Sequence, residues 1–116
     1  MNIFLISRSA HKLQKVAHEI HSAHAVETKC YPLDLTELSQ PQIYDKLHHE
    51  LSNIDVGVLV NNVGVMYDTL QWFLTVPRER LTQIVQLNIS ATLLLTHMVL
   101  PQMVRKLDPG GFFRLS

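Results

Sequence analysis

The chain has 116 residues, 47% of them hydrophobic, which suits one small domain with a buried core and argues against a disordered segment. Its ten basic and ten acidic residues cancel, so charge gives no support for binding nucleic acid or an anionic membrane surface. The single cysteine, Cys30, cannot form an internal disulfide, which fits a reducing compartment. We expect no signal peptide, because no basic segment precedes the first apolar run. The longest apolar-rich run, residues 91–100, is half the roughly 20 residues that a membrane helix needs.

Strand and helix patterns alternate from the start of the chain. Residues 2–7 form a continuous apolar run that predicts a buried strand. Residues 9–24 carry apolar side chains at helical spacing, and Ser9 is placed to act as the N-cap of that helix. Residues 26–34 alternate weakly and contain Pro32, which predicts a short strand near a sheet edge.

The same alternation continues in the second half. Residues 39–52 have apolar side chains four apart and predict an amphipathic helix. The run "VGVLV" (56–60) is the clearest strand pattern. A long helix is expected over about 77–106, with Pro77 suited to its first turn. Residues 110–116, "GGFFRLS", begin like a further strand.

This order of elements predicts parallel strand pairing with right-handed crossovers, which is a doubly wound α/β sheet of Rossmann type. Ligands of such sheets bind beyond the carboxyl ends of the strands. Asn61, Asn62 and Gly64 directly follow the run at 56–60, so they are expected at such an end. Asn and Gly are also common turn residues, and an ordinary turn remains an alternative explanation for them.

Several blocks of the sequence resemble the short-chain dehydrogenases/reductases: "NIFLISRSAHKLQKVAHEI", "YPLDLT", "DVGVLVNNVG", "IVQLNISA" and "MVLPQMV". Val63 replaces the alanine of the family's usual Asn-Asn-Ala-Gly motif, a variant similar to the 17β-hydroxysteroid dehydrogenase and very-long-chain 3-oxoacyl-CoA reductase branch. The resemblance covers essentially the whole chain. It implies that residues 1–116 are a partial NAD(P)-binding Rossmann domain holding strands two to five of the family fold.

The resemblance also assigns roles to residues around the expected cofactor. Asn61 would tie the central strands together, and the backbone of residues 62–64 would lie along the cofactor ribose. Asp34, with Leu35, would receive the adenine amino group. From the sequence pattern alone, Asp34 reads more simply as a turn or capping residue before the following helix.

Two basic residues lie where the second family strand meets its helix. An acidic residue at position 8 would favour NAD, whereas the arginine present there, Arg8, can bind the 2′-phosphate of NADPH. Lys12 follows one helical turn later. A solvated basic residue is the simpler explanation, but cations at a helix N-terminus oppose the helix dipole, so an anionic partner accounts better for the pair. We therefore expect NADPH as the cofactor.

Asn88 lies inside the long predicted helix, among apolar neighbours, where a buried amide needs a hydrogen-bond partner. An exposed or capped amide is the alternative. The resemblance makes Asn88 the asparagine of the family's catalytic tetrad, which holds a water between the catalytic lysine and a proton relay. By contrast, His18, His21 and His24 spread over about 120° of a helix, and no metal site is expected.

The resemblance also implies parts that this chain lacks. The family's glycine-rich turn is expected before residue 1 and its catalytic serine after Ser116, and no Tyr-x-x-x-Lys is present. The chain is thus expected to be an internal fragment, inactive alone and missing the central first strand. The parent is expected to reduce a 3-oxoacyl-CoA or ketosteroid with NADPH; an inactive relative with a binding or regulatory role is the alternative.

The resemblance finally implies a substrate class, an oligomeric state and a cellular location for the parent protein. A lipid-like substrate, an acyl-CoA or a steroid, is expected, with no nucleic acid. A homodimer is expected through the helix over 77–106. The endoplasmic reticulum membrane is the expected location, with the mitochondrion or cytoplasm as alternatives.

Overall fold

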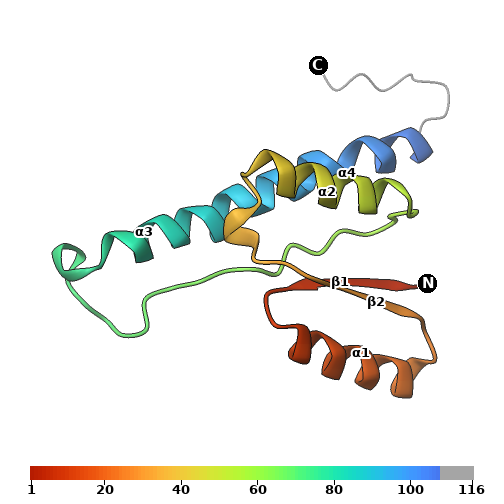
Figure 1. Ribbon diagram of the computed structural model, residues 1–116, viewed down its shortest axis with the longest axis horizontal. Helices are drawn as coiled ribbons and strands as arrows, with labels where there is room; N and C mark the ends of the chain where they lie inside the picture. The colour runs from red at the N-terminus through yellow and green to blue at the C-terminus, as the bar shows by residue number, and fades with distance from the viewer. Residues whose placement is uncertain (108–116) are drawn as a thin grey trace. The chain divides into compact units, whose positions relative to one another are not determined.

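The computed structural model describes residues 1–107, which fall into two compact units, Met1–Leu35 and a second unit that begins at Thr36 (Figure 1). The first unit contains strand β1 (Ile3–Ser7), helix α1 (Ala10–His24) and strand β2 (Thr28–Pro32). The second contains α2 (Pro41–Ser52), α3 (Arg78–Val85), a π-helical turn (Gln86–Ser90) and α4 (Ala91–Leu107). Short 3₁₀ turns lie at Leu35–Glu37 and Phe73–Thr75. The strand expected from residue 110 lies outside the described residues.

In the first unit, β1 and β2 pair in parallel, from Ile3 opposite Thr28 to Ser7 opposite Pro32. Parallel strands need a crossover connection, and α1 supplies it. The predicted N-cap is confirmed, because the Ser9 hydroxyl accepts a hydrogen bond from the Lys12 amide at 3.3 Å. The unit therefore has the β-α-β arrangement that the sequence predicted.

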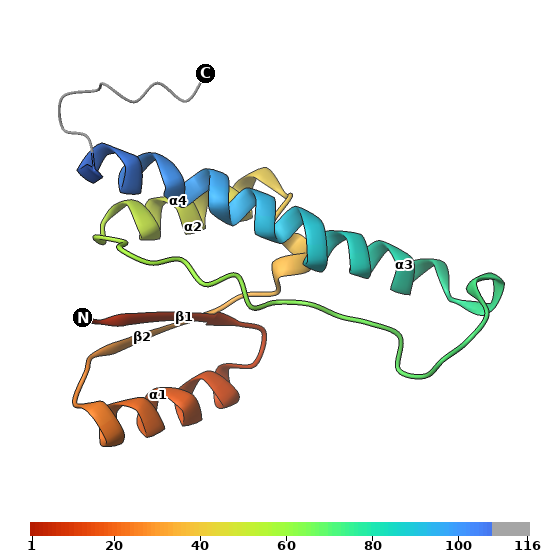
Figure 2. The same ribbon diagram turned by 180° about the vertical axis from the view of Figure 1, so that it is seen from behind.

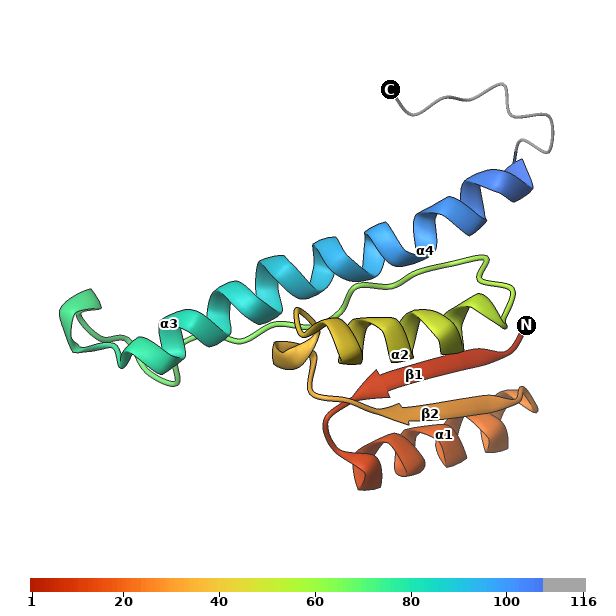
Figure 3. The same ribbon diagram turned by 45° about the horizontal axis from the view of Figure 1, so that its top comes forward.

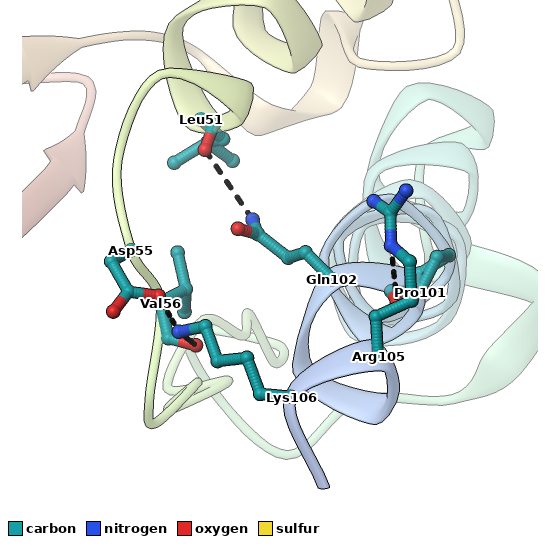
Figure 4. Close-up of polar contacts among 7 residues, drawn as sticks. All are labelled: Leu51, Asp55, Val56, Pro101, Gln102, Arg105 and Lys106. Carbon is teal, nitrogen blue, oxygen red and sulfur yellow. Dashed lines mark hydrogen bonds and ion pairs between the residues drawn. The ribbon is translucent and has the colours of Figure 1, made fainter. Parts of the chain in front are cut away.

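In the second unit, α2 and α4 lie side by side, as Figures 2 and 3 show from two directions. Two of the apolar positions spaced four apart on α2, Leu47 and Leu51, are buried. The Gln102 amide of α4 also donates to the Leu51 carbonyl at 3.3 Å (Figure 4). The buried hydrophobic side chains of this unit are Leu38, Leu47, Leu51, Val76, Leu87, Ala91, Leu95, Met98 and Val99.

The long helix predicted over 77–106 is present over Arg78–Leu107. Pro77 is its N-cap rather than a first-turn residue. The turn at Gln86–Ser90 is π-helical, which the sequence did not indicate. By length and composition alone this helix could cross a membrane, although its longest uninterrupted apolar-rich run is short. Core helices of soluble domains meet the same criterion, so the helix does not by itself place the chain in a membrane.

The strand predicted at 56–60 is wrong for this structure. These residues belong to an irregular connection between α2 and α3, and Val58 and Val60 are 67% and 76% exposed (Figure 3). A strand exists only when a neighbour takes up its backbone hydrogen bonds. Among the described residues only β1 and β2 pair with each other, so the run at 56–60 has the pattern of a buried strand without a partner.

Candidate functional site

In the first unit, the predicted basic residues lie at the N-terminus of α1. Arg8 follows β1 and is exposed, and Lys12 is exposed in the first turn of α1. No acidic side chain occupies that turn. Two cations beside the positive end of a helix dipole raise the local positive potential, which an anion would neutralise. This end of α1 is therefore chemically suited to a phosphate.

Asp34 and Leu35 come just after β2, at the same edge of the two-stranded sheet. The Leu33 amide donates to the Ser7 carbonyl at 3.0 Å, so the pairing continues one residue beyond the strands. Asp34 is half-buried, and the Leu35 side chain is buried. The parallel pairing thus brings Arg8 and Asp34 to the same carboxyl edge, where a ligand of a doubly wound sheet would lie.

In the second unit, the connection that carries Asn61 is attached to α4. The Asn61 amide donates to the Thr96 hydroxyl at 3.1 Å, and that hydroxyl donates to the Thr92 carbonyl at 2.7 Å. Asn61 was predicted to tie strands together, but its contact among the described residues is with a helix. Thr96 was not singled out from the sequence, because a threonine on a helix usually bonds its own backbone.

Asn88 is half-buried and both ends of its side chain are bonded to one residue. Its Nδ2 donates to the Val65 carbonyl at 2.9 Å, and its Oδ1 accepts from the Val65 amide at 2.8 Å. An exposed or capped amide is thereby excluded. The need for a partner was visible in the sequence, but the partner was not, since Val65 is distant in sequence and contributes only backbone atoms. Asn88 also lies in the π-helical turn, a feature frequent at functional sites.

Gly64 lies directly against this pair. A Cβ on Gly64 would come within 3.2 Å of Asn88 Oδ1, whereas a Cβ on Gly57 would meet open space. Gly64 does not adopt a left-handed φ, so the close approach of the Asn88 amide, rather than backbone strain, explains the glycine. Among the described residues, no backbone–backbone hydrogen bond involves residues 61–64. Their amides and carbonyls are therefore free to meet a ligand or a strand.

Among the three histidines considered as metal ligands, His21 makes a local contact in the structure. His21 Nδ1 lies 3.2 Å from the Val26 carbonyl, next to the C-terminus of the helix. In the described part of the chain, no three His, Cys, Asp or Glu side chains are grouped as metal ligands would be.

The sequence matches the family model described as short chain dehydrogenase over residues 1–111. The chain belongs to this oxidoreductase family, and the predicted resemblance is confirmed. Curated relatives include the very-long-chain 3-oxoacyl-CoA reductase of Bos taurus, which is 40% identical over 118 residues and covers 100% of this chain and 36% of the relative. The inactive hydroxysteroid dehydrogenase-like protein 1 of Homo sapiens is 42% identical over 106 residues, covering 91% of this chain and 32% of the relative. This chain thus spans about a third of the length of these relatives.

Solved structures support the same fold. A short-chain dehydrogenase from Sphingobium yanoikuyae in complex with NADPH matches with a TM-score of 0.76 at 23% identity, covering 90% of this chain and 40% of that one. A ketone-specific alcohol dehydrogenase from Comamonas testosteroni matches with a TM-score of 0.75 at 20% identity, with 90% and 41% coverage. At these identities the likeness concerns the fold alone. The predicted Rossmann-type class is confirmed.

Proposed function

We propose that the full-length protein containing this chain is an NADPH-dependent carbonyl reductase that acts on a 3-oxoacyl-CoA or a ketosteroid. The observation that carries this proposal is the 40% identity to a very-long-chain 3-oxoacyl-CoA reductase along the entire chain. The stretch shared with this relative contains every residue that we propose to bind the cofactor. The geometry of both units supports the proposal.

The residues present fit such a cofactor. Arg8 and Lys12 would bind the 2′-phosphate, in keeping with the acid-free N-terminus of α1. Asp34 and Leu35 would receive the adenine, and the unpaired backbone of residues 62–64 would follow the ribose. NADPH, when bound, supplies a hydride to the carbonyl carbon of the substrate. The general acid would be a tyrosine outside this chain.

In this proposal Asn88 contributes to catalysis by holding a water molecule of the proton relay. One N–H and the oxygen of its side chain are already bonded to Val65. The second N–H of the side-chain amide remains able to donate to a water molecule. The Val65 contact keeps that position fixed relative to residues 61–64. Asn88 would thus order a water of the proton relay without using the atoms that hold Val65.

The cofactor part of the proposal is tested by exchanging Arg8 for aspartate in the full-length protein. Arg8→Asp removes the partner of a 2′-phosphate and adds an acceptor for a 2′-hydroxyl, so the ratio of kcat/KM for NADPH over NADH should fall at least about tenfold, or ~1.4 kcal/mol. Lys15→Asp makes the same charge change on an exposed residue beyond the first turn of α1 and should leave the ratio unchanged. An equal ratio in wild type and Arg8→Asp would show that Arg8 does not contact the cofactor.

The activity itself is tested by following NADPH oxidation by the full-length protein with long-chain 3-oxoacyl-CoA and ketosteroid substrates. Turnover with either class supports the proposal and identifies the substrate. A second candidate is a catalytically inactive binding protein, favoured by the 42% identity to the inactive human relative. Binding of NADPH without turnover of any carbonyl substrate, with no tyrosine at the general-acid position of the full-length sequence, would establish this second function.

We also propose that the full-length protein is a homodimer formed through α3 and α4. Apolar side chains on one face of this helix are between 39% and 64% exposed: Val85, Ile89, Leu93 and Leu100. They recur at helical spacing opposite the buried face. Such a stripe along a long helix suits packing against an identical helix around a two-fold axis.

A further inference from the structure

Residues 66–74, which lead from Val65 to the 3₁₀ turn before α3, are apolar for an exposed connection, and we call them the apolar segment. Asp68 is the only charged residue between positions 61 and 77. The large apolar side chains of the segment are each 67% or more exposed in the described part of the chain: Met66, Leu70, Trp72, Phe73 and Leu74. An exposed group of this kind marks a surface that meets an apolar partner or ligand.

The apolar segment is held to the second unit at both of its ends. Near its start, Asp68 forms an ion pair with Arg80 of α3 at 2.9 Å. At its far end, the Trp72 carbonyl accepts hydrogen bonds from the Thr75 amide at 2.9 Å and from the Thr75 hydroxyl at 2.7 Å. Val76, directly after the turn, is buried. The charge and this carbonyl thus have partners within the chain, whereas the large apolar side chains are left exposed.

The apolar segment begins beside the candidate catalytic position. Its first residue directly follows Val65, which exchanges two hydrogen bonds with the Asn88 side chain. At about 1.5 Å per helical residue, Arg80, the partner of Asp68, lies about 12 Å before Asn88. The segment then reaches the start of α3 at Arg78, about 15 Å from Asn88 (Figure 2). Exposed apolar side chains are therefore available from beside Asn88 to a point roughly 15 Å away.

We propose that residues 66–74 bind the hydrocarbon chain of the substrate, so that the full-length protein takes a long-chain 3-oxoacyl-CoA rather than a ketosteroid. This inference rests on the proposed function, because Asn88 is taken to lie near the reacting carbonyl. The ring system of a steroid is rigid and shorter than the interval from Asn88 to α3, whereas a long acyl chain is flexible and can follow it. An uncharged apolar surface suits an acyl chain, which has no polar group to satisfy.

Binding along the apolar segment would make affinity depend on the length of the substrate. Each methylene group removed from water is worth roughly fourfold in affinity. The reacting atoms lie away from Trp72 and Leu74, so contacts there hold the substrate and the transition state equally and their loss raises KM without changing kcat. A short 3-oxoacyl-CoA has the same reacting group but lacks the part that would reach these side chains. Substrates of different length therefore separate acyl binding from a role in folding.

The test compares Leu74→Ala and Trp72→Ala with Leu107→Ala in the full-length protein. Leu107 is a matched control, because it is 85% exposed where Leu74 is 94% exposed, and it lies at the opposite end of the long helix. KM and kcat are measured at saturating NADPH with 3-oxoacyl-CoA substrates of increasing chain length. For long chains, KM should rise roughly three- to tenfold in Leu74→Ala and at least about tenfold in Trp72→Ala, at unchanged kcat.

The increase in KM should shrink with chain length and vanish for acetoacetyl-CoA, and Leu107→Ala should show none at any length. Equal losses with short and long substrates would overturn the proposal, since these side chains would then support the fold. Unchanged KM at every length would overturn it too. In that case, binding of the wild type but not of Trp72→Ala to phosphatidylcholine vesicles would assign the segment to a membrane surface.

The failure of this inference can be told apart from the failure of the proposed function. A wild type that reduces ketosteroids but no 3-oxoacyl-CoA would overturn the acyl assignment and leave a carbonyl reductase. If no carbonyl compound is turned over, the proposed activity fails, and titration with a long-chain acyl-CoA still decides the role of the segment. A change in Trp72 fluorescence that is absent in Trp72→Phe supports acyl binding, and an unchanged signal overturns it.

Discussion

Asn88 replaces, with one side chain, the hydrogen bonding that a neighbouring strand would provide. Its amide offers one donor and one acceptor to the N–H and C=O of Val65, at 2.8 and 2.9 Å. This is the exchange made by a hydrogen-bonded pair in a sheet. The segment that precedes α3 is thereby fixed to the long helix at the residue next to Gly64, which explains why a glycine follows the two asparagines.

Enlarging Gly64 should disrupt this pair. A valine at Gly64 would press on Asn88 Oδ1, where even a Cβ lies at 3.2 Å, and would cost the full-length apoprotein about 1–3 kcal/mol of unfolding free energy. The Kd for NADPH should rise at least about tenfold, or ~1.4 kcal/mol. Thermal melts without cofactor and NADPH titrations measure the two effects separately.

Gly57→Val is the control for this substitution, because nothing lies within 4 Å of a Cβ there. It should leave cofactor affinity unchanged. Normal melting and normal NADPH binding by Gly64→Val would mean that the Asn-Asn-Val-Gly stretch is only a turn, as the simpler interpretation of the sequence holds.

Ala25 has a left-handed backbone conformation that a glycine would adopt with less strain. It ends α1 with φ 51° and ψ 33°, and its amide bonds the His21 carbonyl at 2.9 Å. This left-handed cap favours glycine. Ala25→Gly should stabilise the full-length protein by about 0.5–1 kcal/mol, measured by denaturant unfolding. Ala17→Gly in the middle of α1 should destabilise it by a similar amount. A loss of stability in Ala25→Gly would contradict the strained cap.

The roles of some residues could be predicted from their neighbours in sequence, whereas the roles of others could not. Ser9 was identified as an N-cap because capping depends only on its neighbours in sequence. The need of Asn88 for a partner followed from its apolar surroundings. The identity of that partner, Val65, and the role of Thr96 depend on which segments meet in space, and no local pattern contains that information.

At the scale of elements, helices were predicted better than the strand at 56–60. Helices satisfy their backbone hydrogen bonds internally, so α1, α2 and α4 need only their own periodicity and caps. The apolar run at 56–60 needs a neighbouring strand, and none pairs with it among the described residues. Its sequence suits the interior of a sheet, whereas in the structure the run is attached to α4 through the hydrogen bond from Lys106 to the Val56 carbonyl.

The π-helical turn at Gln86–Ser90 also escaped prediction. An extra residue in one turn leaves the apolar periodicity of a long helix almost intact, so the pattern over 77–106 reads as a continuous α-helix. In the structure the turn carries Asn88, and Leu87 within the turn and Ala91 directly after it are buried. The irregularity thus coincides with the candidate catalytic position.

The exposed stripe on α3 and α4 gives a test at this scale. Leu93→Glu would place a charge in the centre of the proposed dimer contact, where it would be desolvated, and should convert the full-length protein from dimer to monomer. Sedimentation or light scattering measures the change. Gln14→Glu, which adds the same charge to an exposed residue of α1, is the control and should remain dimeric. A dimeric Leu93→Glu would exclude this helix face as the interface.

At the scale of the whole molecule, the chain spans about a third of the length of these relatives, and several large apolar side chains of its described residues are exposed. Its one sheet among the described residues has two strands, a size that is marginal in water. Five exposed large apolar side chains lie close together in sequence before α3: Met66, Leu70, Trp72, Phe73 and Leu74. Soluble monomeric domains rarely expose such a cluster without a partner.

The isolated 116-residue chain should therefore behave as an incompletely packed protein. It is expected to bind the dye ANS, to melt without a sharp transition and to show no NADPH-dependent turnover, since it contains no Tyr-x-x-x-Lys and a missing general acid alone costs about 10²–10⁴-fold in rate. Trp72, the single tryptophan, is 85% exposed and should fluoresce at the long wavelength of indole in water. The full-length protein should show a blue-shifted Trp72 signal, read by comparison with a Trp72→Phe variant. A blue-shifted emission and a cooperative melt of the isolated, monomeric chain would show that these residues pack fully on their own.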